Sequence, residues 1–103
     1  MKITAQRVDF IKAIKLVSRA IGSSSSAMPI LAGIRVEAQG NRLLLYATDL
    51  ECTVQCALPA ENADGDSTIV LNGELLGKIA KSLPGETFAL ETVPDTDKVK
   101  IAS

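Results

Sequence analysis

Residues 34–47 read IRVEAQGNRLLLYA, and this stretch decides the fold because it predicts a β-hairpin. Its first part, residues 34–38, alternates apolar and polar side chains, which is typical of a strand with one face buried and one face in water. Residues 39–41, QGN, indicate a turn. The apolar alternation resumes over residues 43–47. Two such runs joined by so short a turn are expected to pair in the antiparallel sense.

The flanking segments extend this hairpin to nine elements. Helices are indicated where apolar residues recur at three- and four-residue steps, and strands where they alternate. The first helix is expected over residues 9–21 with Gly22 as its stop, and the second from its cap Asn72 to about Leu83. The other strands are expected at residues 2–5, 52–58, 68–71, 88–90 and 99–101.

The predicted order is therefore β-α-β-β-β-β-α-β-β, with Pro59 ending the fourth strand and a loop over residues 61–67. Because most connections between strands are short, we expect an α+β domain with a mostly antiparallel sheet and two helices packed on one face. The last predicted strand is followed directly by Ser103, so a closing strand is expected to be missing.

Size and composition restrict the class of protein. The chain has 103 residues, which is the size of one domain, and a net charge of −1. It has no apolar run long enough to span a membrane and no secretory signal at its start, so we expect a cytoplasmic protein. It has no histidine and only three aromatic residues, too few for a platform that stacks single-stranded bases.

Residues 46–56, YATDLECTVQC, hold the one dense group of carboxylates and thiols. Cys52 and Cys56 stand four apart on a predicted strand, about 13 Å, which is too far for a disulfide. Two thiols without histidine also make a poor zinc site, so we expect both cysteines to be buried and structural. Asp49 and Glu51 fit a turn better than a catalytic pair, because a hairpin tip offers no pocket to separate their pKa values. No catalytic residue, metal or cofactor is predicted.

The basic residues are grouped on the predicted helices. Lys12, Lys15 and Arg19 form one stripe opposite the apolar face of the first helix, and Lys78 and Lys81 share a face of the second. The acidic residues are expected mainly in loops, at Glu61, Asp64, Asp66, Asp95 and Asp97. Such a stripe is suited to phosphate contacts without reading bases. An ordinary solvated helix face is the alternative interpretation.

The order of motifs resembles the N-terminal domain of the bacterial DNA polymerase III beta subunit, the replicative sliding clamp. The specific part is PILxGI followed at a fixed distance by TDLE. The resemblance covers essentially the whole chain through MKIT (1–4), KLVSRAI (15–21), MPILAGIRVEA (28–38), GNRLLLYATDLE (40–51), CALPAE (56–61) and TIVLNGELLGKIAKSLPG (68–85).

The resemblance implies a DNA clamp fold and a non-catalytic processivity factor. Members are homodimeric rings of three-domain subunits that encircle double-stranded DNA and tether the polymerase. It implies that residues 1–103 are the first of three domains, truncated at the C-terminal end. Polymerase and clamp loader would bind through domains absent here, and neither a membrane nor a cofactor is implied. The DNA-facing residues would be Lys12, Lys15, Arg19, Lys78 and Lys81.

The chain departs from the family pattern at two places. Many members carry a basic residue followed by Pro-Thr before the PIL motif, where this chain has serine and alanine within residues 24–27. Only a weak phosphate contact is therefore expected from Ser24 and Ser25. Glu74 stands where a cation would suit DNA better. The alternative to a clamp domain is a stand-alone protein-interaction module with the same fold.

Overall fold

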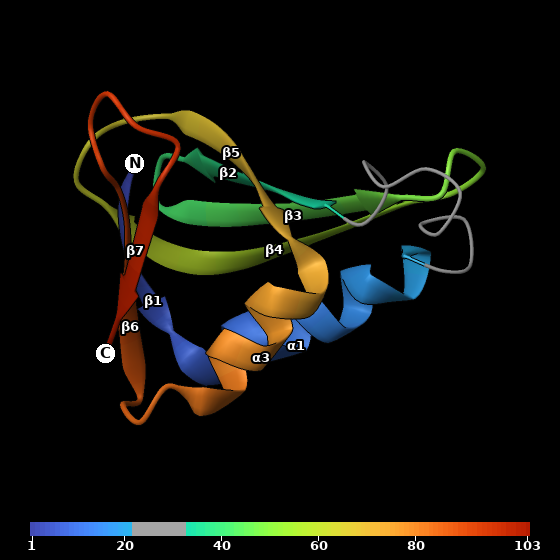
Figure 1. Cartoon of the computed structure of the whole chain (residues 1–103), viewed down its shortest axis with the longest axis horizontal. Coiled ribbons are helices and arrows are strands. Elements are labelled where there is room, and N and C mark those ends of the chain that lie inside the picture. The colour runs from blue at the N-terminus through green and yellow to red at the C-terminus, as the bar shows by residue number, and fades with distance from the viewer. Residues whose placement is uncertain (22–32) are drawn as a thin grey trace.

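The computed structural model describes residues 1–21 and 33–103, and it confirms the predicted order of elements. The two helices and seven strands of this part are shown in Figure 1. A 3₁₀ turn, η1 (Ser18–Ala20), continues the first helix. The bounds are β1 (Lys2–Gln6), α1 (Arg7–Val17), β2 (Gly33–Gln39), β3 (Arg42–Thr48), β4 (Thr53–Asn62), β5 (Ser67–Asn72), α3 (Gly73–Ser82), β6 (Thr87–Thr92) and β7 (Val99–Ala102).

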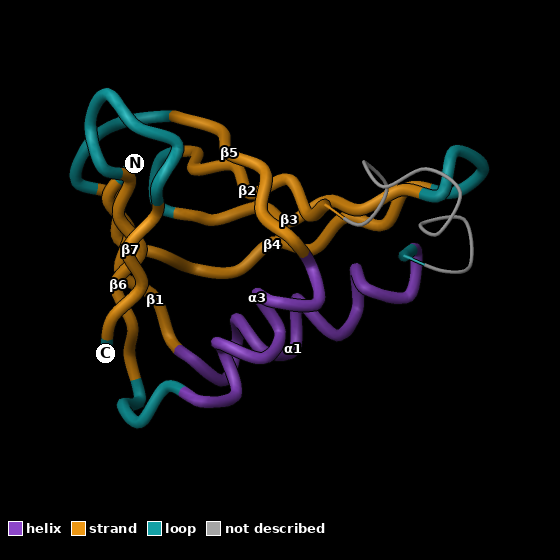
Figure 2. Tube along the Cα trace, in the orientation of Figure 1, coloured by secondary structure: helices purple, strands orange, loops and turns teal. Residues whose placement is uncertain are grey.

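The seven strands form one curled antiparallel sheet in the order β5-β2-β3-β4-β1-β6-β7. Figure 2 shows β1, β6 and β7 running across the direction of β2, β3 and β4, with both helices on the same side of the sheet. The prediction of a mostly antiparallel sheet with two helices on one face is therefore confirmed. Among the described residues, no helix is long and apolar enough to cross a bilayer.

Strand β4 joins the two halves of the sheet and corrects the prediction that Pro59 ends a strand. The strand continues to Asn62, so most of the expected loop at residues 61–67 lies beyond it. Pro59 makes the last pair with β3, opposite Arg42, and Ala60 pairs with Ala5 of β1. A proline is tolerated here because pairing with β3 stops at Pro59 and pairing with β1 begins at Ala60, so the ladder is interrupted at this point.

The core lies between the curled sheet and the two helices. Helix α1 buries Phe10, Ala13, Ile14 and Val17, as its three- and four-residue spacing predicts. The Phe10 ring stacks on Phe88 of β6 with the ring centroids 4.3 Å apart. Burying a side chain of this size contributes about 1.5–3 kcal/mol, so this apolar face is what holds α1 against the sheet.

The β3–β4 hairpin ends in the predicted turn, but neither of the two cysteines is fully buried. Asp49 Oδ1 accepts hydrogen bonds from the backbone N–H groups of Glu51 (3.0 Å) and Cys52 (2.7 Å). Cys52 therefore belongs to the turn and is exposed, whereas Cys56 packs partly against the core. The prediction of burial is wrong for Cys52, because the hairpin tip extends past the body of the domain (Figure 1), and Cys56 is only partly buried.

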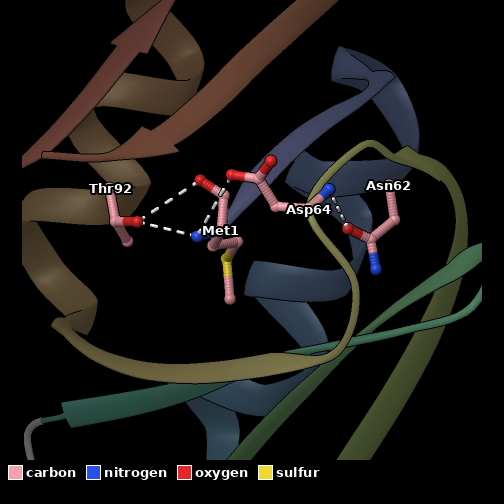
Figure 3. Close-up of polar contacts among 4 residues, drawn as sticks. All are labelled: Met1, Asn62, Asp64 and Thr92. Carbon is pink, nitrogen blue, oxygen red and sulfur yellow. Dashed lines mark hydrogen bonds and ion pairs between the residues drawn. The ribbon is translucent and has the colours of Figure 1, made fainter. Parts of the chain in front are cut away.

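The N-terminus is held between the β4–β5 loop and the end of β6, as Figure 3 shows. The Met1 ammonium group donates a hydrogen bond to Thr92 Oγ1 (2.7 Å) and lies 4.0 Å from Asp64 Oδ2. The Met1 carbonyl accepts from the Thr92 backbone N–H at 2.9 Å. The first residue of the chain thereby connects two segments that are more than 25 residues apart in sequence.

Candidate nucleic-acid interface

Helix α3 begins at a side-chain cap and packs by one face. Asn72 Oδ1 accepts a hydrogen bond from the Leu75 backbone N–H at 2.9 Å, which confirms the predicted cap. Leu76 and Ala80 are buried, and Leu83 follows the helix as a further core residue. Because these apolar residues face the core, the lysines between them are directed to the outer surface.

The two helices lie side by side, and Gly77 of α3 faces Ile14 of α1. A Cβ atom built at Gly77 would be 3.7 Å from Ile14 Cγ2 of α1, an ordinary van der Waals distance. The small residue leaves an open groove of about 400 Å³ between the helices. The groove is lined from α1 and η1 by Ile11, Ile14, Lys15 and Ser18, and from α3 by Gly73, Glu74, Gly77, Lys78, Ala80 and Lys81.

The groove brings together three of the five predicted DNA-facing cations. Lys15 comes from α1, and Lys78 and Lys81 come from α3. Lys12 and Arg19 are exposed on α1 and η1 but do not line the groove. The fold thus combines two stripes that are about 60 residues apart in sequence into one basic surface on the helices. The serines proposed as weak loop contacts, Ser24 and Ser25, lie outside the described residues.

Glu74 is an acidic member of the same groove. Its Oε1 lies 3.3 Å from Lys78 Nζ, one helical turn away. Both side chains are well exposed, 81% for Glu74 and 72% for Lys78. A glutamate four residues before a lysine is the favourable orientation of such a pair, so the spacing alone predicts the contact. The sequence did not show that this pair stands in the groove with Lys15 and Lys81.

Four of the five acidic residues expected in loops from the sequence lie there, and the fifth, Glu61, lies in β4. Asp64 and Asp66 lie in the β4–β5 loop, and Asp95 and Asp97 lie in the β6–β7 turn. Both loops lie at the upper left of Figure 1, whereas the helices lie below the sheet. A net charge of −1 therefore conceals a basic helical surface and an acidic end of the sheet.

This arrangement suits the phosphate backbone of a nucleic acid. Exposed ammonium groups are strongly hydrated point charges on flexible stems, so they attract phosphate without fixing one geometry. The apolar walls at Ile11, Ile14 and Ala80 offer no hydrogen bond to a base edge. The surface can therefore attract a polyanion with little dependence on its sequence.

Comparisons with known proteins agree with the sequence resemblance. Residues 1–103 match the family model described as DNA polymerase III beta subunit, N-terminal domain. A beta sliding clamp of Staphylococcus epidermidis is 31% identical over 100 residues, covering 89% of this chain and 26% of that protein. A DNA polymerase sliding clamp of Caulobacter crescentus superposes with a TM-score of 0.87 at 28% identity, covering 98% of this chain and 27% of that one.

A DNA polymerase III beta subunit of Thermotoga maritima gives the same result. It superposes with a TM-score of 0.85 at 30% identity, covering 99% of this chain and 27% of that one. The chain thus spans about a quarter of the length of these relatives.

Proposed function

Because the chain belongs to the family of the DNA polymerase III beta subunit, as its N-terminal domain, we propose that it forms one segment of a sliding clamp around duplex DNA. The complete clamp would be a homodimeric ring, with this domain as the first of three in each subunit. The relatives, which are about four times as long as this chain, support that arrangement. The role needs no catalytic group, and it places the protein in the cytoplasm with the DNA.

The observation that carries the proposal is the basic surface of the two helices. Lys15, Lys78 and Lys81 surround one groove, and Lys12 and Arg19 extend the charge along α1 and η1. The sheet lies behind this surface, and the two acidic loops lie at one end of the sheet (Figure 1). A duplex is therefore attracted to the helices and repelled by the loops.

Sliding requires attraction without a fixed register. Each exposed lysine forms a weak contact that salt screens within about 10 Å and that transfers easily from one phosphate to the next. A closed ring stays on DNA because it encircles the duplex, so its inner surface does not need to bind the DNA tightly. The polymerase and the clamp loader would bind the other domains of the subunit.

Charge reversal in the complete subunit tests this proposal. The triple change Lys12→Glu, Lys15→Glu and Arg19→Glu should shorten retention on circular duplex DNA because it replaces attraction with repulsion. A matched control reverses Lys2, Lys98 and Lys100, which are exposed and lie outside the helices. Equal retention by the helix variant and the control would instead favour a protein-interaction module whose lysines are only solvated.

A further inference from the structure

Glu74 lies in the first turn of α3, where the helix dipole weakly favours a carboxylate, but the helix has two stronger supports. Asn72 already caps α3, and the helix is held against the core by Leu76 and Ala80. An exposed ion pair such as Glu74–Lys78 contributes little to stability, because both side chains are well solvated. Its position among the groove lysines therefore calls for a role at the surface rather than in folding.

Glu74 competes with phosphate for the same lysine. A carboxylate and a phosphate both bind an ammonium group through anionic oxygens, so they are alternative partners for Lys78. The distance of 3.3 Å between Glu74 Oε1 and Lys78 Nζ shows that the carboxylate forms an ion pair with this ammonium group. A phosphate that approaches Lys78 therefore has to share its ammonium group with Glu74 or displace the carboxylate.

The competition changes the charge of the whole groove. Among the described residues, three lysines and one glutamate line it, which leaves a net charge of +2. Lys78 is the one of these three lysines with a carboxylate within 4.0 Å in the part of the chain that the structure describes. Glu74 also lines the same groove as Lys15 and Lys81, so its negative charge opposes a phosphate drawn into the groove.

We propose that Glu74 is an internal competitor of the DNA backbone, which lowers the affinity of the groove for phosphate and keeps each contact short-lived. The inference rests on the proposed function and specifies how that site is regulated. A groove without this carboxylate would hold duplex more tightly and slide more slowly, which a mobile clamp has to avoid. Glu74 is thus assigned a role in setting mobility.

A double-mutant cycle tests the competition directly. The 103-residue chain is titrated with a fluorescent duplex at low salt (about 20 mM), where weak charge contacts are measurable. Glu74→Gln should raise the affinity about fivefold, the effect of one unit charge near 4 Å in water. It should also make the affinity for duplex fall more steeply with salt concentration, by the amount expected for about one more phosphate contact. Lys78→Gln should cost more affinity in the Glu74→Gln background than in the wild type.

Glu61→Gln is the matched control, since it removes the same charge from an exposed position on β4, outside the groove. An equal rise in affinity for both variants would overturn the inference, because net charge alone would explain it. Additive effects of Glu74→Gln and Lys78→Gln would overturn it as well. If Glu74→Gln lowers the melting temperature and leaves the affinity for duplex unchanged, Glu74 stabilises helix α3 and the inference is wrong. If no variant binds duplex, the groove is not a DNA surface, and the proposed function fails with the inference.

Discussion

Leu50, at the tip of the β3–β4 hairpin, has a φ of 79°, which lies in the left-handed region that leucine rarely adopts. Its neighbours make this conformation possible. Thr48 Oγ1 accepts from the Leu50 backbone N–H at 3.1 Å, and Asp49 Oδ1 accepts from the two N–H groups that follow. The dense polar stretch at residues 46–56 is therefore a turn whose side chains satisfy backbone donors, as the sequence predicts.

Asp49 makes the stability of this turn depend on pH. The hydrogen bonds from the Cys52 and Glu51 backbone N–H groups hold the pKa of the Asp49 carboxyl below its ordinary value. The folded state thus binds this proton less readily than the unfolded state, so the stabilisation is present at neutral pH. It is lost as the pH falls below about 4 and through the lowered pKa.

Asp49→Asn should therefore lower the melting temperature at pH 7, and the difference from the wild type should vanish toward pH 2. Thermal melts across this range measure it. Glu51→Gln is the control, because it removes a neighbouring exposed carboxylate that accepts no hydrogen bond in the described part of the chain. A constant difference between Asp49→Asn and the wild type at every pH would contradict this account of the turn.

At the scale of elements, local patterns predict which segments form helices and strands. Alternation identifies β2 and β3, and three- and four-residue spacing identifies α1 and α3. Local patterns do not predict features that depend on tertiary structure. Pro59 lies within β4 because the strand changes partner there, and Cys52 is exposed because the hairpin tip extends past the core.

The packing of α1 on α3 gives a prediction at this scale. A Cβ at Gly77 meets Ile14 Cγ2 at 3.7 Å, so alanine fits without displacing α1. Because glycine in a helix interior is less favourable than alanine by about 1 kcal/mol, Gly77→Ala should raise the free energy of unfolding by about that amount. Urea titration measures the change.

Gly85→Ala is the contrasting variant. There the added Cβ would lie 3.1 Å from the Thr87 carbonyl oxygen and 3.2 Å from Ser103 Cβ, closer than ordinary contacts. We expect Gly85→Ala to destabilise the chain by about 1 kcal/mol or more, as overpacking does. Destabilisation by Gly77→Ala instead would show that the helices are closer together than described.

At the scale of the whole molecule, the arrangement of elements was not available from local sequence patterns. Strand β1 lies between β4 and β6, both of which are more than 45 residues away in sequence. The groove exists because α1 and α3 are adjacent. The amphipathic patterns of the two helices do not predict that the helices are neighbours. The lysine stripes were visible in the sequence, but their meeting around Gly77 required the fold.

The contacts of Met1 test how the β4–β5 loop is held to the end of β6. Thr92→Val removes the hydroxyl that accepts from the partly buried Met1 ammonium group, leaving Asp64 at 4.0 Å as its polar partner among the described residues. We expect the free energy of unfolding to fall by about 1.5–3 kcal/mol, the contribution of a hydrogen bond to a charged group. Thr87→Val, on the exposed part of β6, should change it little. Equal stabilities of the two variants would show that the Met1 contact is not structural.

The central claim is that duplex DNA contacts the helical surface and not the sheet. The measurement that tests it most directly is a two-dimensional NMR titration of the ¹⁵N-labelled chain with a short duplex at low salt. The account predicts that amide shifts concentrate at Lys12, Lys15, Lys78 and Lys81, and that added salt reverses them. Shifts concentrated on the outer face of β2, β3 and β4, or no shifts at all, would contradict it.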